Sequence, residues 1–276
     1  MSLPFIRTAD VDLDDNELER VTRLASEAVA ASGAVTLRHF RQSVAVDNKL
    51  TDGFDPVTDA DRDCEQFLRD AMARELPDYG FFGEEAGYTR GDSGLTWVVD
   101  PIDGTRSFIS GVPLWGTLVG LSNGQRPIAG VMYQPFTDEL YCGNRLGGTL
   151  THRGVERPLK CSSVETLAEA RLFCTSTDIF TPAERPAYDR VADAARLLRS
   201  GTDCYAYCLL AAGEADLVVE AGLQCYDIYA LIPIIESAGG VVTSWDNGDP
   251  SLGGTVVAAA TAALHEEALA LLREAR

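Results

Sequence analysis

Apolar residues recur at helical spacing near the start of the chain. Between residues 16 and 41, positions such as Leu18, Val21 and Val29 fall on one face and predict a long amphipathic helix. The stretch 44–57 follows, which contains glycine and proline and is expected to form a loop. The loop therefore separates this helix from whatever begins near residue 58.

A second helix is predicted to begin after Thr58. The segment Thr58-x-x-Asp61 resembles a capping box, in which two side chains satisfy free backbone N–H groups at a helix N-terminus. Phe67 and Leu68 belong to an apolar face of this helix, and Pro77 follows its end. The first part of the chain thus supplies two helices whose apolar faces must be buried against another part of the protein.

Strand patterns follow, and after Gly148 strands alternate with helices. The stretch 80–85 reads as a short strand that ends in two acids, and 115–143 reads as an antiparallel meander. The elements expected later are a strand near 171–175, helices at 183–199 and 203–213, a strand at 216–220, a helix at 227–238, strands near 240–244 and 255–259, and a helix at 262–275. We expect a mixed α/β fold, with an α+β first half and a more alternating second half, and a single domain over 1–276 with subdomains 1–147 and 148–276.

The predicted helix at 227–238 is apolar on nearly every face, so we expect it to be buried. Asp227 at its start is either an N-cap or a metal ligand, and it can be both. Pro233 in the interior should bend the helix or free a backbone carbonyl.

Composition narrows the classes of partner. The 276 residues carry a formal net charge of −19, which argues against nucleic acid or an anionic membrane. No apolar run approaches the ~20 residues that span a bilayer, and the N-terminus lacks the apolar core of a signal peptide, so we expect a cytoplasmic protein. The seven cysteines form no CxxC pair and are expected to be reduced and mostly buried.

The segment Asp100-Pro-Ile-Asp103-Gly-Thr105 is the strongest chemical signal in the chain. It follows the apolar run Trp97-Val98-Val99, which reads as the end of a buried strand. Two carboxylates at a turn can hold a hard cation such as Mg²⁺, which prefers oxygen ligands. Glycine lets a phosphate approach the backbone, and a helix start offers free N–H groups to the anion. The alternative is an acidic turn in which aspartate only caps a helix.

Several motifs together resemble the inositol monophosphatase family of metal-dependent phosphatases. They occur in the family's order and cover essentially the whole chain, with Tyr226 at a position where many members have tryptophan. The motifs are Asp55-Pro-Val-Thr-Asp-Ala-Asp61 with Glu65 four residues on, Gly83-Glu84-Glu85, Trp97-Val-Val-Asp-Pro-Ile-Asp-Gly-Thr105, and Cys225-Tyr226-Asp227 leading to Glu236-Ser-Ala-Gly-Gly240. The resemblance implies a layered αβαβα sandwich, a small phosphate ester as substrate and a homodimer.

The resemblance also implies roles for individual residues. Two or three Mg²⁺ ions would be bound by Glu84, Asp100, the Ile102 carbonyl, Asp103 and Asp227, with Asp61 sharing a more weakly held ion. Thr105, with Glu84 or Asp61, would orient and deprotonate the attacking water. The backbone amides of Gly104 and Thr105 would hold the phosphate, and Lys49 would help to neutralise the site.

Two other classes of site fit less well. Phosphatases that form an aspartyl-phosphate carry D-x-D-G-T, whereas here the two acids stand three residues apart, at Asp100 and Asp103. An EF-hand loop starting at Asp59 would need glycine where Cys64 stands and glutamate where Asp70 stands. A catalytically dead metal-binding protein on the same fold stays open, and an assay with and without Mg²⁺ separates it from an enzyme.

Three stretches, at 106–117, 203–207 and 231–236, resemble the histidinol-phosphate phosphatase branch of the family more than the inositol branch. Glu220 lies seven residues before Asp227, where the family has a substrate-binding acid, and Asp203 stands where inositol-specific members tend to have a small residue. Two acids suit a cation such as the amine of histidinol. The alternatives are inositol monophosphate or another small ester, with Asp203 only capping the helix that starts at Cys204.

Overall fold

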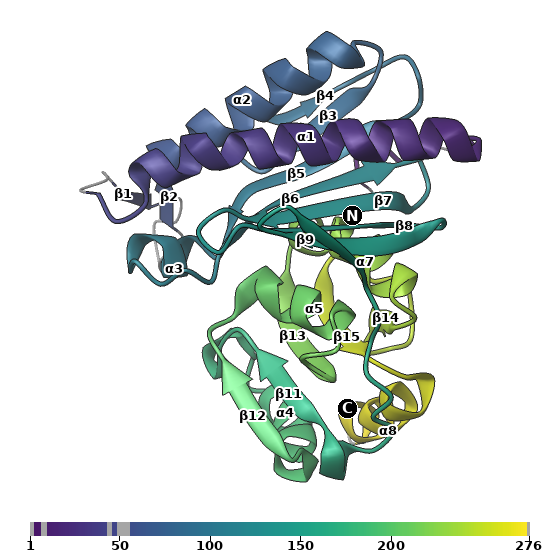
Figure 1. Cartoon of the computed structure of the whole chain (residues 1–276). Helices are drawn as coiled ribbons and strands as arrows, with labels where there is room; N and C mark the ends of the chain where they lie inside the picture. The colour runs from purple at the N-terminus through teal and green to yellow at the C-terminus, as the bar shows by residue number, and fades with distance from the viewer. Residues whose placement is uncertain (1–2, 7–9, 43–45, 49–55, 275–276) are drawn as a thin grey trace.

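Five layers of helices and sheets build the molecule. The computed structural model describes residues 3–6, 10–42, 46–48 and 56–274. Figure 1 shows α1 and α2 above a large sheet, α5 and α7 below it, then a smaller sheet, and finally α4 and α8. The expected αβαβα sandwich is confirmed, and the two larger sheets each lie between layers of helices.

The two helices of the top layer have the predicted starts. Helix α1 covers Asp15–His39, and α2 covers Asp59–Glu75. The capping box at Thr58 is confirmed, because the Asp61 carboxylate accepts the Thr58 backbone N–H at 2.8 Å and Thr58 caps the helix in return. Apolar side chains of both helices are buried against the large sheet, so local capping and packing agree.

The large sheet has eight strands in the order β10-β9-β8-β7-β6-β5-β3-β4. Most neighbours run antiparallel, whereas β3 and β5 are parallel and therefore end at the same edge. The pairing of β5 with β6 is irregular between Asp100 and Asp103. The strands are β3 Gly80–Gly83, β4 Gly87–Thr89, β5 Thr96–Asp103, β6 Gly116–Ser122, β7 Pro127–Gln134, β8 Glu139–Asn144, β9 Gly147–His152 and β10 Val155–Pro158, and the short helix α3 covers Thr105–Ile109.

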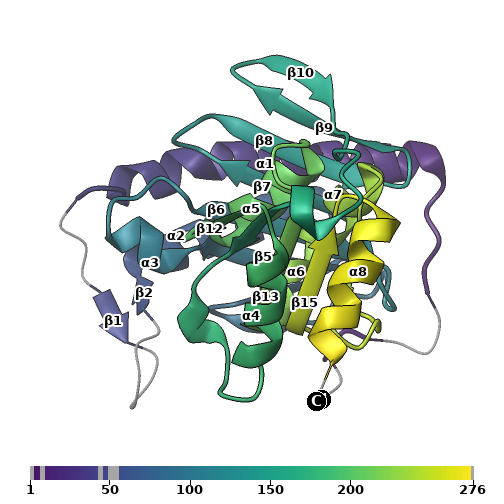
Figure 2. The same cartoon turned by 90° about the horizontal axis from the view of Figure 1, so that it is seen from below.

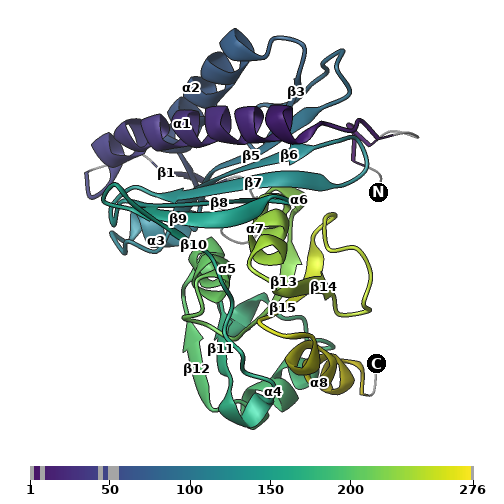
Figure 3. The same ribbon diagram turned by 45° about the vertical axis from the view of Figure 1, so that its right-hand side comes forward.

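The second sheet has five strands in the order β12-β11-β13-β15-β14. Figure 2 shows α4 and α8 crossing its outer face, and Figure 3 shows α5, α6 and α7 between the two sheets. These elements are β11 Arg171–Cys174, α4 Arg185–Ala194, β12 Leu197–Ser200, α5 Asp203–Ala211, β13 Leu217–Leu223, α6 Cys225–Tyr229, α7 Leu231–Ser237, β14 Val241–Ser244, β15 Gly254–Ala259 and α8 Ala262–Arg273, with short 3-10 helices at Leu167–Glu169 and Thr177–Ile179.

Three local predictions need correction. The helix expected at 183–199 ends at Ala194, because Leu197–Ser200 pairs with β11 as a parallel edge strand. The helix expected at 227–238 is divided at Ala230 into α6 and α7; Pro233 lies in the first turn of α7 and donates no backbone hydrogen bond there. The loop expected at 44–57 contains most of a two-stranded ribbon, β1 Val46–Asn48 with β2 Pro56–Thr58.

The large sheet continues to Pro158, beyond position 147, where the sequence suggests a boundary between subdomains; that division stays a prediction. Six of the seven cysteines are buried, as expected, and all seven are free thiols. Within the described ranges, no helix combines the length and the apolar character needed to cross a membrane.

Candidate active site

The irregular end of β5 and the turn that follows it are shaped by their own side chains. Asp100 accepts the backbone N–H of Ile102 at 3.1 Å, and the Thr105 hydroxyl donates to the Ile102 carbonyl at 3.0 Å. Gly104 has φ +85°, a left-handed conformation in which glycine carries no steric penalty, and α3 starts directly after it. The end of β5 therefore holds two carboxylates and one carbonyl in a fixed arrangement.

Three carboxylates from two distant parts of the chain meet at the end of β5. One oxygen each of Asp100, Asp103 and Asp227 lies within 4.8 Å of the others. Asp227 is brought there by α6, where its carboxylate accepts the Gln224 backbone N–H at 2.8 Å. It is thus the third residue of a capping box whose cap is Gln224, and the N-cap expected at Asp227 itself is wrong.

Glu84 and Asp61 lie next to this cluster. Strand β3 runs parallel to β5, and the Glu84 backbone N–H continues the pairing by donating to Val99 at 3.1 Å. Burial raises the pKa of both Asp100 and Asp61, and the negative charge of Glu84 adds to the effect. One oxygen of Asp61 is occupied by the backbone and hydroxyl of Thr58, and Glu84 lines the cavity while Asp61 does not.

Two acids of the second part of the chain share the same cavity. Asp203 is the first residue of α5, and its carboxylate accepts the Ser107 hydroxyl at 3.0 Å rather than capping its own helix. Glu220 on β13 accepts the backbone N–H and the hydroxyl of Thr175 through one oxygen, at 2.6 and 3.0 Å. Its other oxygen is buried without a hydrogen-bond partner among the described residues.

The cavity has a volume of about 400 Å³. Six carboxyl groups and one arginine, Arg106, contribute to its wall, and Ile179, Leu223 and Tyr226 add apolar surface. The predicted site residues that line it are Glu84, Asp100, Ile102, Asp103, Gly104, Thr105, Asp203, Glu220 and Asp227. Lys49 lies outside the described residues.

Burial and mutual repulsion make these acids hard to ionise. Burial raises the pKa of Asp103 to about 7 and that of Glu220 to about 8. The pKa of Asp61 is raised to about 7, mainly by burial. Asp100 and Asp227 also have pKa values well above the ordinary range, because both are buried and surrounded by other acids.

The donor set fits a hard divalent cation. Carboxylate and carbonyl oxygens are the ligands that Mg²⁺ prefers. The cluster of Asp100, Asp103 and Asp227 concentrates negative charge in buried surroundings, and a cation between these groups would stabilise their charged forms. Glu84 and the Ile102 carbonyl stand on the same cavity wall and can complete the set.

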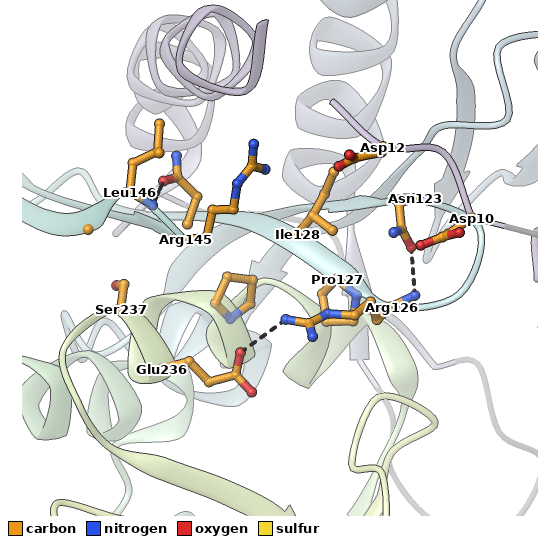
Figure 4. Close-up of a pocket in the computed structure, with 13 residues that line it drawn as sticks. Asp10, Asp12, Asn123, Arg126, Pro127, Ile128, Arg145, Leu146, Glu236 and Ser237 are labelled. Carbon is orange, nitrogen blue, oxygen red and sulfur yellow. Dashed lines mark hydrogen bonds and ion pairs between the residues drawn. The ribbon is translucent and has the colours of Figure 1, made fainter. Parts of the chain in front are cut away.

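A second cavity, of about 620 Å³, lies between the β6–β7 turn, the β8–β9 turn and α7 (Figure 4). Its two arginines are already paired: Arg126 lies 3.6 Å from Glu236, and Arg145 lies 2.6 Å from Asp15. The carboxylate cluster is not part of its wall. The candidate active site is therefore the cavity around Asp103.

Supporting residues emerge that the motifs alone did not assign. Glu65 accepts the backbone N–H groups of Glu85 and Ala86 at 2.7 and 2.9 Å, and so fixes the turn that carries Glu84. A Cβ on Gly83 would overlap the Glu65 carboxylate, which explains the glycine before Glu84. The sequence motif includes Glu65 but does not indicate its role, because its hydrogen-bond partners lie about twenty residues away.

Comparison with known proteins gives a consistent family assignment. The sequence model described as "Inositol monophosphatase family" matches residues 17–276. The bifunctional phosphatase IMPL2, chloroplastic, of Arabidopsis thaliana is 37% identical over 269 residues, which cover 94% of this chain and 76% of the relative. A histidinol-phosphatase of Chlorobaculum parvum is 36% identical, with 79% of this chain and 83% of the relative covered. A solved inositol monophosphatase from Zymomonas mobilis has a TM-score of 0.81 and 36% identity, and covers 92% of this chain and 98% of that one.

Proposed function

Because the chain belongs to the inositol monophosphatase family of phosphatases, we propose that it is a Mg²⁺-dependent phosphomonoesterase that converts L-histidinol phosphate and water into L-histidinol and phosphate. The observation that carries the choice of substrate is the pair of acids, Asp203 and Glu220, on the wall of the cavity that contains Asp100, Asp103 and Asp227. This substrate would give the protein a role in histidine biosynthesis.

The metal ions would be held by the acids of the two chain segments. Glu84, Asp100, Asp103, Asp227 and the Ile102 carbonyl are the proposed ligands, with Asp61 near a further, weaker position. Two or three Mg²⁺ ions would neutralise the phosphate, make a water molecule more acidic and stabilise the departing alkoxide. Hydrolysis of this kind needs no protein nucleophile.

The residues of the turn would position the reactants. The Thr105 hydroxyl lies at the Ile102 carbonyl, at the edge of the acid cluster, where it can orient the attacking water and pass its proton toward Glu84 or Asp61. The backbone N–H groups of Gly104 and Thr105 would hold the phosphate oxygens at the start of α3. Both roles depend on the fixed turn after β5.

Asp203 and Glu220 would bind the ammonium group of the substrate. A neutral polyol such as inositol needs no second carboxylate, whereas an amine gains a charge-assisted hydrogen bond of ~1.5–3 kcal/mol. Glu220 keeps one buried oxygen without a partner in the described part of the chain, which a cationic ligand would satisfy. The alternative substrates are inositol monophosphate, which the Zymomonas mobilis neighbour's name favours, or another small ester.

Asp203→Asn tests this assignment. Asparagine keeps the shape and tolerates the positive φ of +44° at this position, so the loss should be one of charge. We expect kcat/KM for L-histidinol phosphate to fall about ten- to a hundredfold and hydrolysis of glycerol phosphate to change little. The control is Asp178→Asn, an exposed aspartate of a neighbouring turn that does not line the cavity.

Two results would contradict the assignment. Equal losses on both esters would give Asp203 a role in the metal site or the fold, and a wild-type preference for inositol phosphate would exclude histidinol phosphate as the main substrate. Mg²⁺-dependent release of phosphate from any of these esters would still exclude a catalytically dead binding protein.

We also propose a homodimer that works in the cytoplasm. The dimer rests on the resemblance to a family whose members are often dimeric, and light scattering after gel filtration measures it directly. A monomer with full activity would refute this part and leave the proposed reaction untouched.

A further inference from the structure

A single hydroxyl connects the metal turn to the acid proposed for substrate selection. Ser107, on the short helix α3, donates from its Oγ to Oδ2 of Asp203 at the start of α5, at 3.0 Å. The two residues are 96 positions apart in the chain. Ser107 lies in the connection between β5 and β6 of the large sheet, and Asp203 lies in the connection between β12 and β13 of the second sheet. The bond is partly buried, so water competes for it less than at an open surface.

The backbone around Asp203 leaves its side chain little freedom. Asp203 has φ +44°, a region that side-chain-bearing residues rarely adopt and in which aspartate is enriched. The side chain also lies against the turn, because a Cβ built on Gly104 would stand 3.2 Å from both Cβ and Cγ of Asp203. Asp203 is thus confined between Gly104 and Ser107.

The two carboxylate oxygens of Asp203 have different surroundings. Oδ2 accepts the Ser107 hydroxyl, and no hydrogen bond within the described chain is assigned to Oδ1. Asp203 is part of the cavity wall, together with Glu220 and Asp103. Fixing one oxygen orients the other, which is how a second hydrogen bond turns a flexible acid into a directional acceptor.

We propose that Ser107 is a positioning residue for substrate selection: by holding Oδ2 of Asp203 it directs Oδ1 toward the ammonium group of the substrate. This inference rests on the proposed function for the nature of that group. Ser107 itself is not part of the cavity wall, unlike its neighbours Thr105 and Arg106, so it acts through Asp203.

Ser107→Ala removes the hydroxyl and tests the inference. We expect kcat/KM for L-histidinol phosphate to fall about three- to tenfold, mostly through KM, and that for glycerol phosphate to change less than about twofold. Ser107→Thr keeps a hydroxyl and should restore most of the loss. Ser110→Ala is the matched control, since Ser110 ends the same helix and is exposed.

A double-variant cycle separates positioning from a structural role. If Ser107 acts through Asp203, then Ser107→Ala should cause no further loss in an Asp203→Asn background. Additive losses, equal losses on both esters, or a raised Mg²⁺ requirement in Ser107→Ala would overturn the inference. Thermal unfolding of each variant shows whether a loss comes from the fold.

Failure of the proposed function can be told apart from failure of this inference. If the wild-type enzyme prefers a neutral ester, the assignment to histidinol phosphate fails, and the same cycle is measured with the preferred ester. Non-additive losses there support Ser107 as the residue that positions Asp203, and additive losses refute it.

Discussion

The backbone N–H of Cys204 donates a hydrogen bond of 2.6 Å to Oδ2 of Asp103, across 101 residues of sequence. Cys204 is in the first turn of α5, directly after Asp203. The start of α5 therefore contributes to both ends of the cavity. The Cys204 N–H holds Asp103, a proposed metal ligand, and the Asp203 side chain lines the wall where the substrate amine is proposed to bind. The proposed metal site and the acid proposed for substrate selection therefore share this piece of backbone.

Loss of one metal carboxylate should abolish most of the activity. Asp103→Asn and Asp227→Asn should each lower kcat by at least ~100-fold. The fold should survive, because asparagine can still accept the N–H of Cys204 or of Gln224 through its side-chain oxygen. Steady-state kinetics at several Mg²⁺ concentrations and circular dichroism measure the two effects.

A control and a direct readout sharpen that prediction. Asp193→Asn removes an exposed acid on α4 and should leave kcat unchanged. Crystals soaked in Mn²⁺ should give an anomalous signal among the Asp100, Asp103 and Asp227 carboxylates. A signal only elsewhere, or full activity in the presence of a chelator, would rule out the proposed site.

Thr105→Ala should act on the chemical step. The Thr105 hydroxyl donates to the Ile102 carbonyl and is not one of the three clustered carboxylates. We expect kcat to fall ~100-fold or more, while the Mg²⁺ concentration for half-maximal activity stays within about threefold. Thr105→Ser should keep much of the activity. Near-normal kcat in Thr105→Ala would reduce the hydroxyl to a local structural role.

Glu65→Gln should weaken Mg²⁺ binding without removing a ligand. The Glu65 carboxylate accepts two backbone N–H groups of the turn that carries Glu84, and charge-assisted bonds of this kind are stronger than those to an amide. We expect the Mg²⁺ requirement to rise about threefold to tenfold and kcat at saturating Mg²⁺ to fall less. Glu75→Gln, exposed on the same helix, is the control. An unchanged Mg²⁺ requirement would contradict the supporting role.

The metal-free protein should lose stability as the pH rises from 5 to 8. Asp61, Asp103 and Glu220 have pKa values near 7, 7 and 8 in the folded protein, against ordinary values near 4. In this window the folded state binds more protons than the unfolded state, so the free energy of unfolding falls with increasing pH. We expect Tm to drop by roughly 5 °C or more, and Mg²⁺ to stabilise the protein more at pH 8 than at pH 5.

Variants separate this effect from the overall negative charge. Asp103→Asn should show a shallower fall of Tm with pH than the wild type, whereas Asp193→Asn should follow the wild type. A metal-free Tm that is flat between pH 5 and 8 would show that the buried acids ionise without cost.

Local patterns in the sequence predicted the parts of the fold that depend on local interactions. The capping box from Thr58 to Asp61 lies within one helical turn, so its residues identify it directly. The strand Leu197–Ser200 was predicted as helix, because leucine and arginine favour helices and only the pairing with β11 makes the segment extended. Asp203 likewise combines a positive φ with two neighbours distant in sequence, Gly104 and Ser107, which no local pattern identifies.

The site was predictable to the extent that each acid ends an element. Asp100 and Asp103 lie at the end of the buried strand β5 and Asp227 lies in the first turn of α6, and the structure brings these three together. The hydrogen bonds from Ser107, Thr175 and Cys204 to the acids could not be predicted, because each joins positions 45 or more residues apart. Their residue types are common and carry no signal on their own.

The two ends of the cavity come from different stretches of chain, and this has a consequence for how such a protein can change. Most proposed metal ligands lie between residues 84 and 103, while Thr175, Ile179, Asp203 and Glu220 belong to the later stretch. New substrate preferences can therefore arise by substitution around β11 and β13 while the hydrolytic machinery is inherited intact. Cys204 is the junction: its backbone N–H and its buried thiol both contact Asp103, so a substitution there would act on this acid and on the helix that begins with Asp203 together.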